Sequence, residues 1–360
     1  MSAMYVVATG GTGGHVFPAL ALARELMARG DSVTFITDRR GRRYLPDDIP
    51  GREIAAASPS GGWGRRFTAI FELAKGFFQS LSIIGSLRPR AVACFGGYAS
   101  VPAAFAARFR SVPVMVHEQN AVFGRANRHI GRFARVVALS FEETDNLPAS
   151  DVRQIFTGNP VRPGFDGGVV GDAGAADGME VLVIGGSQGA RILSDVVPQA
   201  MLSLPENLRQ GLRVVQQCRA EDIERVRDAY AGAPFEVELA TFFDDMPERM
   251  ARASLVIGRS GASTISELLA LARPSILIPY LHAADGHQHA NAERLERAGA
   301  ALLLRQDTIT AENLSASLAA LLGDPARLEA MTRAAATLHR PDAASALADA
   351  IRSIGSGGQA

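Results

Sequence analysis

Two glycine-rich turns, each placed directly after an apolar strand-like run, constrain the fold of this chain more than any other feature. Residues 4–9 run into the glycines of residues 10–15, and residues 181–184 run into those of residues 185–189. A strand that ends in glycines and then opens a helix lets backbone N–H groups approach an anion, with the positive end of the helix dipole behind them. Two such turns predict an α/β fold with two nucleotide-binding halves facing each other across a cleft. Either turn alone would equally suit any tight turn between a strand and a helix.

The charge of the chain is balanced overall but not along its length. The 360 residues include 37 basic and 37 acidic ones, yet residues 1–160 hold 19 basic and 12 acidic residues, and the remainder 18 and 25. We therefore expect the first half to attract anions or an anionic surface. Lys75 is the only lysine, which excludes the lysine of a Walker A loop and disfavours Schiff-base chemistry elsewhere.

The cysteines and the hydropathy of the chain indicate in which environment the protein is found. Cys94 and Cys218 lie far apart and follow strand-like runs, so we expect buried, reduced thiols in a cytosolic protein rather than a disulfide or zinc site. The first strand begins within a few residues of the start, which leaves no room for a signal peptide. No apolar run approaches the roughly 18 residues needed to span a bilayer, so any membrane contact should be at the surface.

Strand-like and helix-like segments alternate along the whole chain, which predicts parallel sheets covered on both faces. A helix is expected to open near Phe17, with Pro18 in its first turn, and to stop at Gly30. Residues 158–163 and the polar run to Gly178 are expected to connect two halves, and residues 342–354 to form a helix that packs back on the first domain. The expected strands are residues 5–8, 32–36, 91–95, 112–117, 135–138, 180–184, 212–216, 235–239, 255–257 and 275–279.

A nicotinamide-dependent oxidoreductase is one interpretation of such a fold. Neither glycine turn matches the dinucleotide fingerprint, because Val16 stands where the third glycine belongs and the second turn lacks the G-x-G start. Asp38, however, lies where a ribose-binding acid is expected after the first turn, which keeps this alternative open. A catalytically silent nucleotide-sugar binding protein is a further alternative.

A third segment, residues 258–267, also indicates nucleotide binding. It places a glycine turn and small hydroxyl residues at a helix start, with Glu267 about one turn further on. A carboxylate there can accept hydrogen bonds from both hydroxyls of a ribose. Helix capping alone would select similar residues.

Six motifs in order closely resemble the MurG family of glycosyltransferases over nearly the whole chain. They are GGTGGHVFP (10–18), FGGY (95–98), HEQN (117–120), GNPVR (158–162), GGSQGAR (185–191) and RSGA (259–262) through Glu267. Members are peripheral membrane enzymes that add N-acetylglucosamine (GlcNAc) to lipid I during peptidoglycan synthesis. The resemblance implies a GT-B architecture of two doubly wound, Rossmann-like parallel-sheet domains. Residues 1–160 would form the acceptor- and membrane-associating domain, and residues 161–340 the UDP-GlcNAc-binding domain.

The resemblance also implies the ligands and the place of action. The donor would be UDP-GlcNAc and the acceptor lipid I, with no cofactor, no metal and no nucleic acid. The enzyme would lie on the cytoplasmic side of the bacterial inner membrane, on an anionic surface, with proteins of cell-wall synthesis and division as compatible partners. Substrate-binding roles carry over to Thr12, Gly13, Gly14, Asn120, Arg162, Ser187, Phe243, Ala262, Ser263, Thr264, Ile265, Ser266, Glu267 and Gln288.

The segment around Gln288 departs from the family pattern. His287 stands where a neighbouring glutamine can occur, and the expected loop at residues 281–289 is one residue longer. His282, His287 and His289 do not have the spacing of a zinc-binding helix, and a loop beside a sugar site explains them at least as well. The diphosphate charge could be offset by helix termini and Arg162.

The implied reaction inverts the α-linked donor to a β-(1→4) product, and so needs a base on the acceptor hydroxyl and stabilisation of departing UDP. His15 is the first candidate base, since its ordinary pKa of about 6.5 suits that role. The same residue could instead only position the acceptor. Glu118 is the competing base, and Tyr98 and Asn120 are expected to orient substrate.

Apolar residues recur at helical spacing between Trp63 and Ile84, flanked by Arg65, Arg66 and Lys75. This pattern predicts an interfacial helix with its apolar face in the headgroup region. A helix packed on its own sheet shows the same periodicity, which leaves that alternative open. Gly76 and the adjacent Phe77 and Phe78 widen the apolar face and favour exposure.

Overall fold

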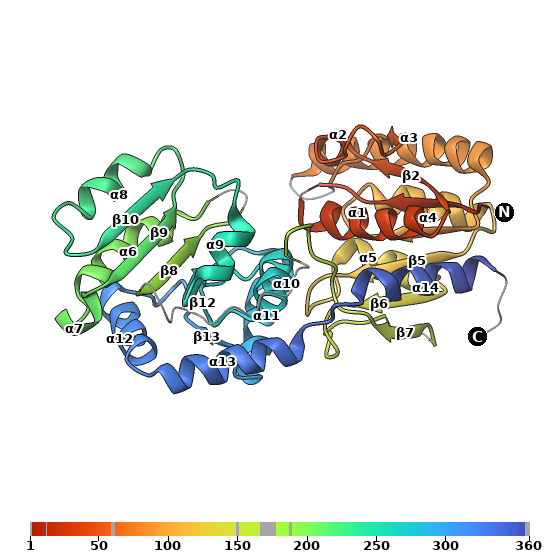
Figure 1. The fold of residues 1–360 in the computed structure, drawn as a ribbon. Helices are drawn as coiled ribbons and strands as arrows, with labels where there is room; N and C mark the ends of the chain where they lie inside the picture. The colour runs from red at the N-terminus through yellow and green to blue at the C-terminus, as the bar shows by residue number, and fades with distance from the viewer. Residues whose placement is uncertain are drawn as a thin grey trace. The chain divides into compact units, whose positions relative to one another are not determined.

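The computed structural model describes residues 2–11, 13–58, 62–148, 151–165, 178–186 and 189–356. The chain divides into two compact units, residues 1–162 with 340–360 (unit 1) and residues 163–339 (unit 2). Each unit is built around its own parallel sheet (Figure 1). The prediction of two doubly wound parallel-sheet domains is confirmed.

In the described part of unit 1, seven parallel strands follow the order β3-β2-β1-β4-β5-β6-β7. Strand order reverses between β1 and β4, and ligands of open α/β sheets commonly bind outside the carboxyl ends of the strands at such a switch point. The strands are β1 (Met4–Ala8), β2 (Ser32–Thr37), β3 (Gly51–Glu53), β4 (Ala91–Cys94), β5 (Val114–Glu118), β6 (Val136–Leu139) and β7 (Arg153–Phe156).

Helices cover both faces of this sheet. One face carries a core that includes Leu22 and Leu26 of α1 and Leu347 of α14, and the other a core that includes Ile84 of α3 and Ile130 of α5. Both cysteines of the chain, Cys94 here and Cys218 in unit 2, are buried free thiols. The helices are α1 (Gly13–Ala28), α2 (Arg39–Arg42), α3 (Trp63–Leu87), α4 (Ser100–Phe109), α5 (Arg125–Gly131) and α14 (Ala343–Gly355).

The first helix begins earlier than the sequence indicated. α1 starts at Gly13 rather than near Phe17, and Pro18 lies inside the helix instead of in its first turn. His15 therefore lies in the first turn of α1. Pro18 has no N–H with which to bond to the carbonyl of Gly14, one turn earlier in the helix.

The C-terminal helix α14 belongs to unit 1. Leu347 and Ile351 are fully buried against the core formed by α1 and β1. Arg29, directly after α1, bonds to Asp349 and donates to the Ser345 hydroxyl at 2.7 Å, and Arg352 pairs with Asp31 at 3.3 Å. Polar contacts thus flank an apolar helix interface.

Unit 2 repeats the plan, and in its described part six parallel strands follow the order β10-β9-β8-β11-β12-β13. The strands are β8 (Met179–Ile184), β9 (Leu212–Gln217), β10 (Glu236–Ala240), β11 (Leu255–Gly258), β12 (Ser275–Leu277) and β13 (Ala301–Leu303). The helices are α6 (Arg191–Leu202), α7 (Glu206–Arg209), α8 (Ile223–Ala229), α9 (Met246–Arg252), α10 (Ala262–Ala270), the 3₁₀ helix η1 (Ala284–Gly286), α11 (His287–Arg297), α12 (Ala311–Leu322) and α13 (Pro325–Leu338).

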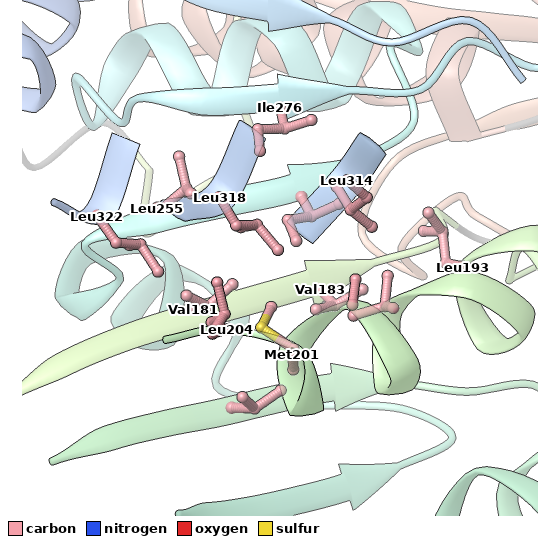
Figure 2. Packing of buried hydrophobic residues seen from close by; sticks show 14 of the residues in the cluster. Val181, Val183, Leu193, Met201, Leu204, Leu255, Ile276, Leu314, Leu318 and Leu322 are labelled. Atoms are coloured by element: carbon pink, nitrogen blue, oxygen red, sulfur yellow. The ribbon is translucent and has the colours of Figure 1, made fainter. Parts of the chain in front are cut away.

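One face of this sheet is closed by α6 and α12. Figure 2 shows Val181 and Val183 of β8 in one buried cluster with Met201 of α6 and Leu318 of α12. The alternate β8 residue, Leu182, is also fully buried, so the strand is apolar on both faces as expected for a covered parallel sheet.

Within the described residues, one helix is long and apolar enough by length and composition to cross a bilayer. This segment, Phe67–Leu87 of α3, spans 21 residues. The prediction concerned uninterrupted apolar runs, and Glu72, Lys75 and Gln79 interrupt this segment, whose average hydropathy remains apolar.

Candidate functional site

The loops after β1 and β4 meet backbone to backbone at the switch point of unit 1. A Cβ on Gly97 would lie 2.4 Å from the Gly10 carbonyl oxygen, and Gly97 has φ +74°. A Cβ on Gly96 would lie 3.0 Å from Cδ2 of the His15 ring. Glycine is thus required at both positions, and its absence of a side chain lets His15 pack directly against the β4 loop.

His15 lies close to a polar cluster at the end of β5. The position of a Cβ on Gly96 is 3.2 Å from His15 Nε2 and 3.8 Å from Asn127 Nδ2, so both side chains border the same small space. Asn127 is buried and donates through Nδ2 to a Glu118 oxygen at 2.8 Å. The Asn127 amide thus bonds to one candidate base, Glu118, and lies near the other, His15.

The Glu118 carboxylate is buried and saturated with donors. Oε2 also accepts from the Gly124 N–H at 2.8 Å, and Oε1 accepts from the N–H and side-chain amide of Asn120, each at 3.1 Å. Burial raises the pKa of this carboxyl, and the donated hydrogen bonds oppose that rise. Its lone pairs are directed at the loop of residues 119–127, which they hold in place.

His117 and Gln119 complete the buried cluster and were not among the predicted site residues. The His117 ring contacts the Gly158 carbonyl oxygen through Nε2 at 3.1 Å and Gln119 Nε2 through Nδ1 at 3.1 Å. Burial lowers the pKa of His117 to about 4, so the ring is neutral near pH 7. Their HEQN motif was visible in sequence, but only the fold reveals that His117 ties β5 to the chain just before Arg162.

Asp38 is occupied by the protein itself. Its Oδ1 accepts from the Gly11 N–H at 3.1 Å and the Gly41 N–H at 2.8 Å, and its Oδ2 pairs with Arg40 at 3.2 Å. The residue is 5% exposed. Asp38 thus caps α2 and fixes the first glycine turn, and its acceptor positions are not directed toward a ribose.

Other predicted residues of unit 1 lie on the same edge of the sheet. Gly13 and Gly14 form the first turn of α1, and Arg162 lies with its guanidinium carbon 5.2 Å from the centroid of the Phe17 ring. Two predicted residues, Thr12 and Ser187, fall outside the described residues.

In unit 2, the start of α10 presents backbone donors. Gly261 is extended (φ −67°, ψ 149°), and no side chain within the described ranges caps this helix start. Ala262, Ser263 and Thr264 form the first turn, and Glu267 is buried at 6% exposure one turn later. Backbone N–H groups at a helix N-terminus beside a carboxylate suit a phosphate joined to a sugar diol.

Two residues predicted in that segment have other partners. Ile265 is 1% exposed and its N–H donates to the Gly261 carbonyl at 2.9 Å. The Ser266 hydroxyl donates to the Ala262 carbonyl at 2.9 Å. Both of these groups therefore bond to the first turn of α10 itself.

Gln288 lies in the first turn of α11, where the sequence had suggested a loop. Its backbone carbonyl accepts from the Ser260 hydroxyl at 2.7 Å, and its Oε1 accepts from the Tyr280 N–H at 2.9 Å. Because a backbone N–H can only donate, the amide orientation is fixed and Nε2 is left to donate. Asn291 adds a bond from Nδ2 to the Ser260 carbonyl at 3.0 Å.

A buried arginine lies behind this network. Arg259 follows β11 and donates to the Ile278 carbonyl at 2.8 Å, with its guanidinium 5.4 Å from the Tyr280 ring centroid. Burial lowers its pKa to about 10, which leaves it charged at neutral pH. Among the residues that the structure describes, no group of three or more His, Cys, Asp or Glu side chains is placed to hold a metal ion.

Phe243 is anchored beneath an arginine. It is 6% exposed, and the Arg249 guanidinium lies 4.3 Å from its ring centroid. Arg249 in turn donates to Asp245 at 2.6 Å and pairs with Glu238 at 2.8 Å. These contacts of Arg249 fix the backbone after β10. The neighbouring Phe242 is 69% exposed.

Two doubly wound parallel-sheet units are the architecture of glycosyltransferases of the GT-B class. The glycosyltransferase family 28 N-terminal domain matches residues 5–139, and the family 28 C-terminal domain matches residues 180–347. The chain belongs to the MurG group of glycosyltransferase family 28.

Similar proteins extend over nearly the whole chain. A UDP-N-acetylglucosamine--N-acetylmuramyl-(pentapeptide) pyrophosphoryl-undecaprenol N-acetylglucosamine transferase of Rhodospirillum centenum is 46% identical and covers 96% of this chain and 93% of its own length. The protein of the same name from Paramagnetospirillum magneticum is 47% identical, covering 97% and 96%. The crystal structure of Acinetobacter baumannii MurG matches with a TM-score of 0.81 and 31% identity, covering 97% and 99%.

Proposed function

We propose that this protein transfers GlcNAc from UDP-GlcNAc to the C4 hydroxyl of the muramyl sugar of lipid I, with inversion at the anomeric carbon. The relatives named for this reaction support the assignment. The structural observation that carries it is the start of α10, where uncapped backbone donors lie one turn before buried Glu267. That pairing recognises a nucleoside diphosphate rather than phosphate alone.

Donor binding is assigned mainly to unit 2. The N–H groups of Ala262, Ser263 and Thr264 would bind the diphosphate, and Glu267 would accept from the ribose hydroxyls. Gln288 supports a contact to the sugar because its amide is held with Nε2 free to donate. The fixed backbone at Phe243 would read the uracil edge, and Arg162 of unit 1 would add positive charge for the diphosphate.

His15 is assigned as the general base. It lies in the first turn of α1 beside the β4 loop, in the unit proposed to receive the acceptor. Glu118 is the weaker candidate, because its oxygens already accept from Asn120, Gly124 and Asn127. We assign Glu118 to positioning: it holds the loop on which Asn120 lies. Departing UDP would be stabilised by the α10 N-terminus and Arg162.

The oxidoreductase alternative loses its main support. It relied on Asp38 as a ribose acceptor, yet this carboxylate accepts from Gly11 and Gly41 and pairs with Arg40. A ribose would have to displace the bonds that shape the glycine turn itself.

Membrane docking is assigned to an aromatic patch formed by exposed side chains on α3 and α4. Along α3, the packed residues Ala69, Gly76 and Ile84 lie on the side opposite Phe67, Phe71 and Phe78. Gly76 is glycine because a Cβ would lie 2.1 Å from the Ala55 carbonyl oxygen, so its role is close packing. The patch comprises Phe67 (69% exposed), Ile70 (61%), Phe71 (71%), Phe78 (67%), Phe105 (42%) and Phe109 (70%).

Ring contacts link the two helices that carry the patch, and both helices also present basic residues. Half-buried Phe77 joins the two helices, with its ring centroid 5.5 Å from that of Phe78 and 6.3 Å from that of Phe109. Exposed Lys75, Arg108 and Arg110 flank these rings. An apolar face rimmed by basic residues suits the anionic cytoplasmic leaflet of the inner membrane, where division and cell-wall proteins could also be met.

A thermal-shift series tests the class of ligand. UDP and UDP-GlcNAc should raise the melting temperature, because a ligand that binds only the folded state stabilises it, whereas NADH should not. Stabilisation by NADH and not by UDP would overturn the proposed function in favour of the oxidoreductase. Stabilisation by UDP-GlcNAc without transfer to a lipid I analogue would favour the silent binding protein.

A further inference from the structure

The loop of residues 241–245, between β10 and α9 of unit 2, is tied at both ends to one arginine. Arg249 lies one turn into α9, and its Nε donates at 2.6 Å to the carboxylate of Asp245, the last residue of the loop. A terminal nitrogen of the same guanidinium pairs at 2.8 Å with Glu238 of β10, just before the loop. These charge-assisted contacts hold the strand before the loop to the helix after it.

The Arg249 guanidinium also covers the middle of the loop. Its central carbon lies 4.3 Å from the centroid of the Phe243 ring, within the range of a cation–π contact. The ring is thus packed beneath a cation that is itself anchored on two carboxylates. Because a turn of the Phe243 backbone would pull the ring from this contact, Arg249 limits the directions that the backbone N–H of Phe243 can take.

This N–H group is suited to a ligand. It has no hydrogen-bond partner among the residues that the structure describes, although Phe243 is nearly buried. Almost all buried N–H groups in proteins are paired, so such a donor suits an acceptor on a bound molecule. Uracil offers a carbonyl oxygen on its base-pairing edge, whereas cytosine carries an NH₂ donor at the same ring position. A fixed N–H here would favour UDP and oppose CDP.

We propose that Arg249 is a positioning residue that makes the donor site selective for uracil, because it holds the Phe243 backbone at the edge of the base. The inference rests on the proposed function, since it takes the uracil of the donor as the ligand of Phe243. In this role Arg249 acts through Phe243 and makes no contact of its own with the donor.

Calorimetric affinities for UDP and CDP test this role. The wild type should bind UDP about tenfold or more tightly than CDP, because CDP sets a donor against the Phe243 N–H. Arg249→Met keeps an apolar side chain over the ring but removes the cation. It should weaken UDP binding about threefold to tenfold and leave CDP binding within twofold of the wild type, so that the preference for UDP shrinks. If Arg249→Met does not fold, Phe243→Leu removes the ring from the same contact and should show the same selective loss.

Arg213→Met is the matched control. Arg213 of β9 pairs with the other oxygen of the Glu238 carboxylate at 2.8 Å and with Glu180 of β8 at 3.2 Å, so it belongs to the same charge network. Loss of this arginine should leave the preference for UDP unchanged. An equal reduction of that preference in Arg213→Met and Arg249→Met would show a general effect on unit 2 and overturn the proposal.

The outcomes separate this inference from the proposed function. An Arg249→Met protein that keeps the full preference of the wild type for UDP would overturn the role of Arg249 alone. Equal weakening of UDP and CDP binding would overturn it too, since that is the mark of a purely structural residue. A wild type that binds both nucleotides equally would overturn the uracil contact at Phe243 and the role of Arg249 with it. Failure of the transferase assignment would appear instead as absent transfer to a lipid I analogue by the wild-type protein.

Discussion

The side-chain amide of Asn127 donates to the carboxylate of Glu118 at 2.8 Å, with both residues buried. Asn127 also donates to the His117 carbonyl at 3.2 Å, so one amide holds the end of β5 against the start of α5. A carboxylate held in this way is a structural support for its loop. The proton acceptor of the transfer reaction is therefore assigned to a different side chain, that of His15.

Replacement of His15 should affect turnover rather than donor binding. His15→Ala should lower kcat about 100-fold or more while UDP affinity stays near that of the wild type, because a general base acts in the transition state. Steady-state kinetics with a lipid I analogue and calorimetry with UDP measure the two quantities. His129→Ala, which removes an exposed histidine of α5, is the control and should behave as wild type.

Glu118→Gln distinguishes the two candidate bases. Exchange of one oxygen for an NH₂ group places a hydrogen-bond donor opposite the N–H groups that now donate to the carboxylate. This should lower the free energy of unfolding by about 1–3 kcal/mol. If folded Glu118→Gln loses more turnover than His15→Ala, or if His15→Ala loses less than tenfold, the base assignment is wrong.

Removal of the Glu267 carboxylate should weaken nucleotide binding. Glu267→Ala should reduce UDP affinity by about 1.5–3 kcal/mol, the range for hydrogen bonds to a charged group. Glu312→Ala, another glutamate near a helix start in unit 2 but exposed, serves as control. Unchanged calorimetric affinity in a folded Glu267→Ala protein would remove α10 from the donor site.

The buried His117 should make unit 1 less stable in acid. Its pKa is about 4 when folded and about 6.5 when unfolded, so between these values the unfolded chain binds a proton that the folded chain does not. The neutral His117 ring contributes up to about 3 kcal/mol to the free energy of unfolding. This contribution is fully present above pH 6.5 and is lost as pH falls toward 4. Melting temperatures from pH 7 to 4.5 should therefore fall less steeply in His117→Gln than in wild type. The assignment to His117 would be contradicted if melting temperature fell equally steeply with pH in His117→Gln and wild type. It would also be contradicted if His129→Gln changed this slope.

Loss of aromatic side chains from the patch should release the protein from vesicles. Phe71→Ser/Phe78→Ser should co-sediment less with anionic liposomes, because exposed rings insert into the headgroup region. Phe242→Ser removes an equally exposed ring from unit 2 and should bind as wild type. Equal binding by the double variant and the wild type would place the membrane contact elsewhere.

The parts of the fold that sequence predicted are those with strong apolar periodicity. The strands that it missed are β3, β7 and β13, each at a sheet edge. Edge strands have one partner and are short, and Arg153 and Gln154 of β7 are both exposed, so an apolar pattern is absent. The start of α1 was misplaced because Pro18 was taken as a first-turn signal.

The site was predictable as motifs but not as contacts. Sequence singled out Glu118, Asn120 and His15 within two motifs, and the types of His15 and Glu118 indicated acid–base chemistry. It could not show that Asn127 and Gly124 saturate Glu118, or that Asp38 bonds to Gly11, because both depend on how separate loops meet. The amide orientation of Gln288 likewise comes from Tyr280, whose N–H reaches it only after α11 forms.

Transfer itself is the most direct test of the central claim. Purified protein incubated with UDP-GlcNAc and a lipid I analogue should release UDP only when the acceptor is present, and NMR of the product should show a GlcNAc β-(1→4)-linked to the muramyl sugar. An α-linked product, UDP release that does not require the acceptor, or no transfer by a protein that binds UDP-GlcNAc would contradict the proposed inverting transferase.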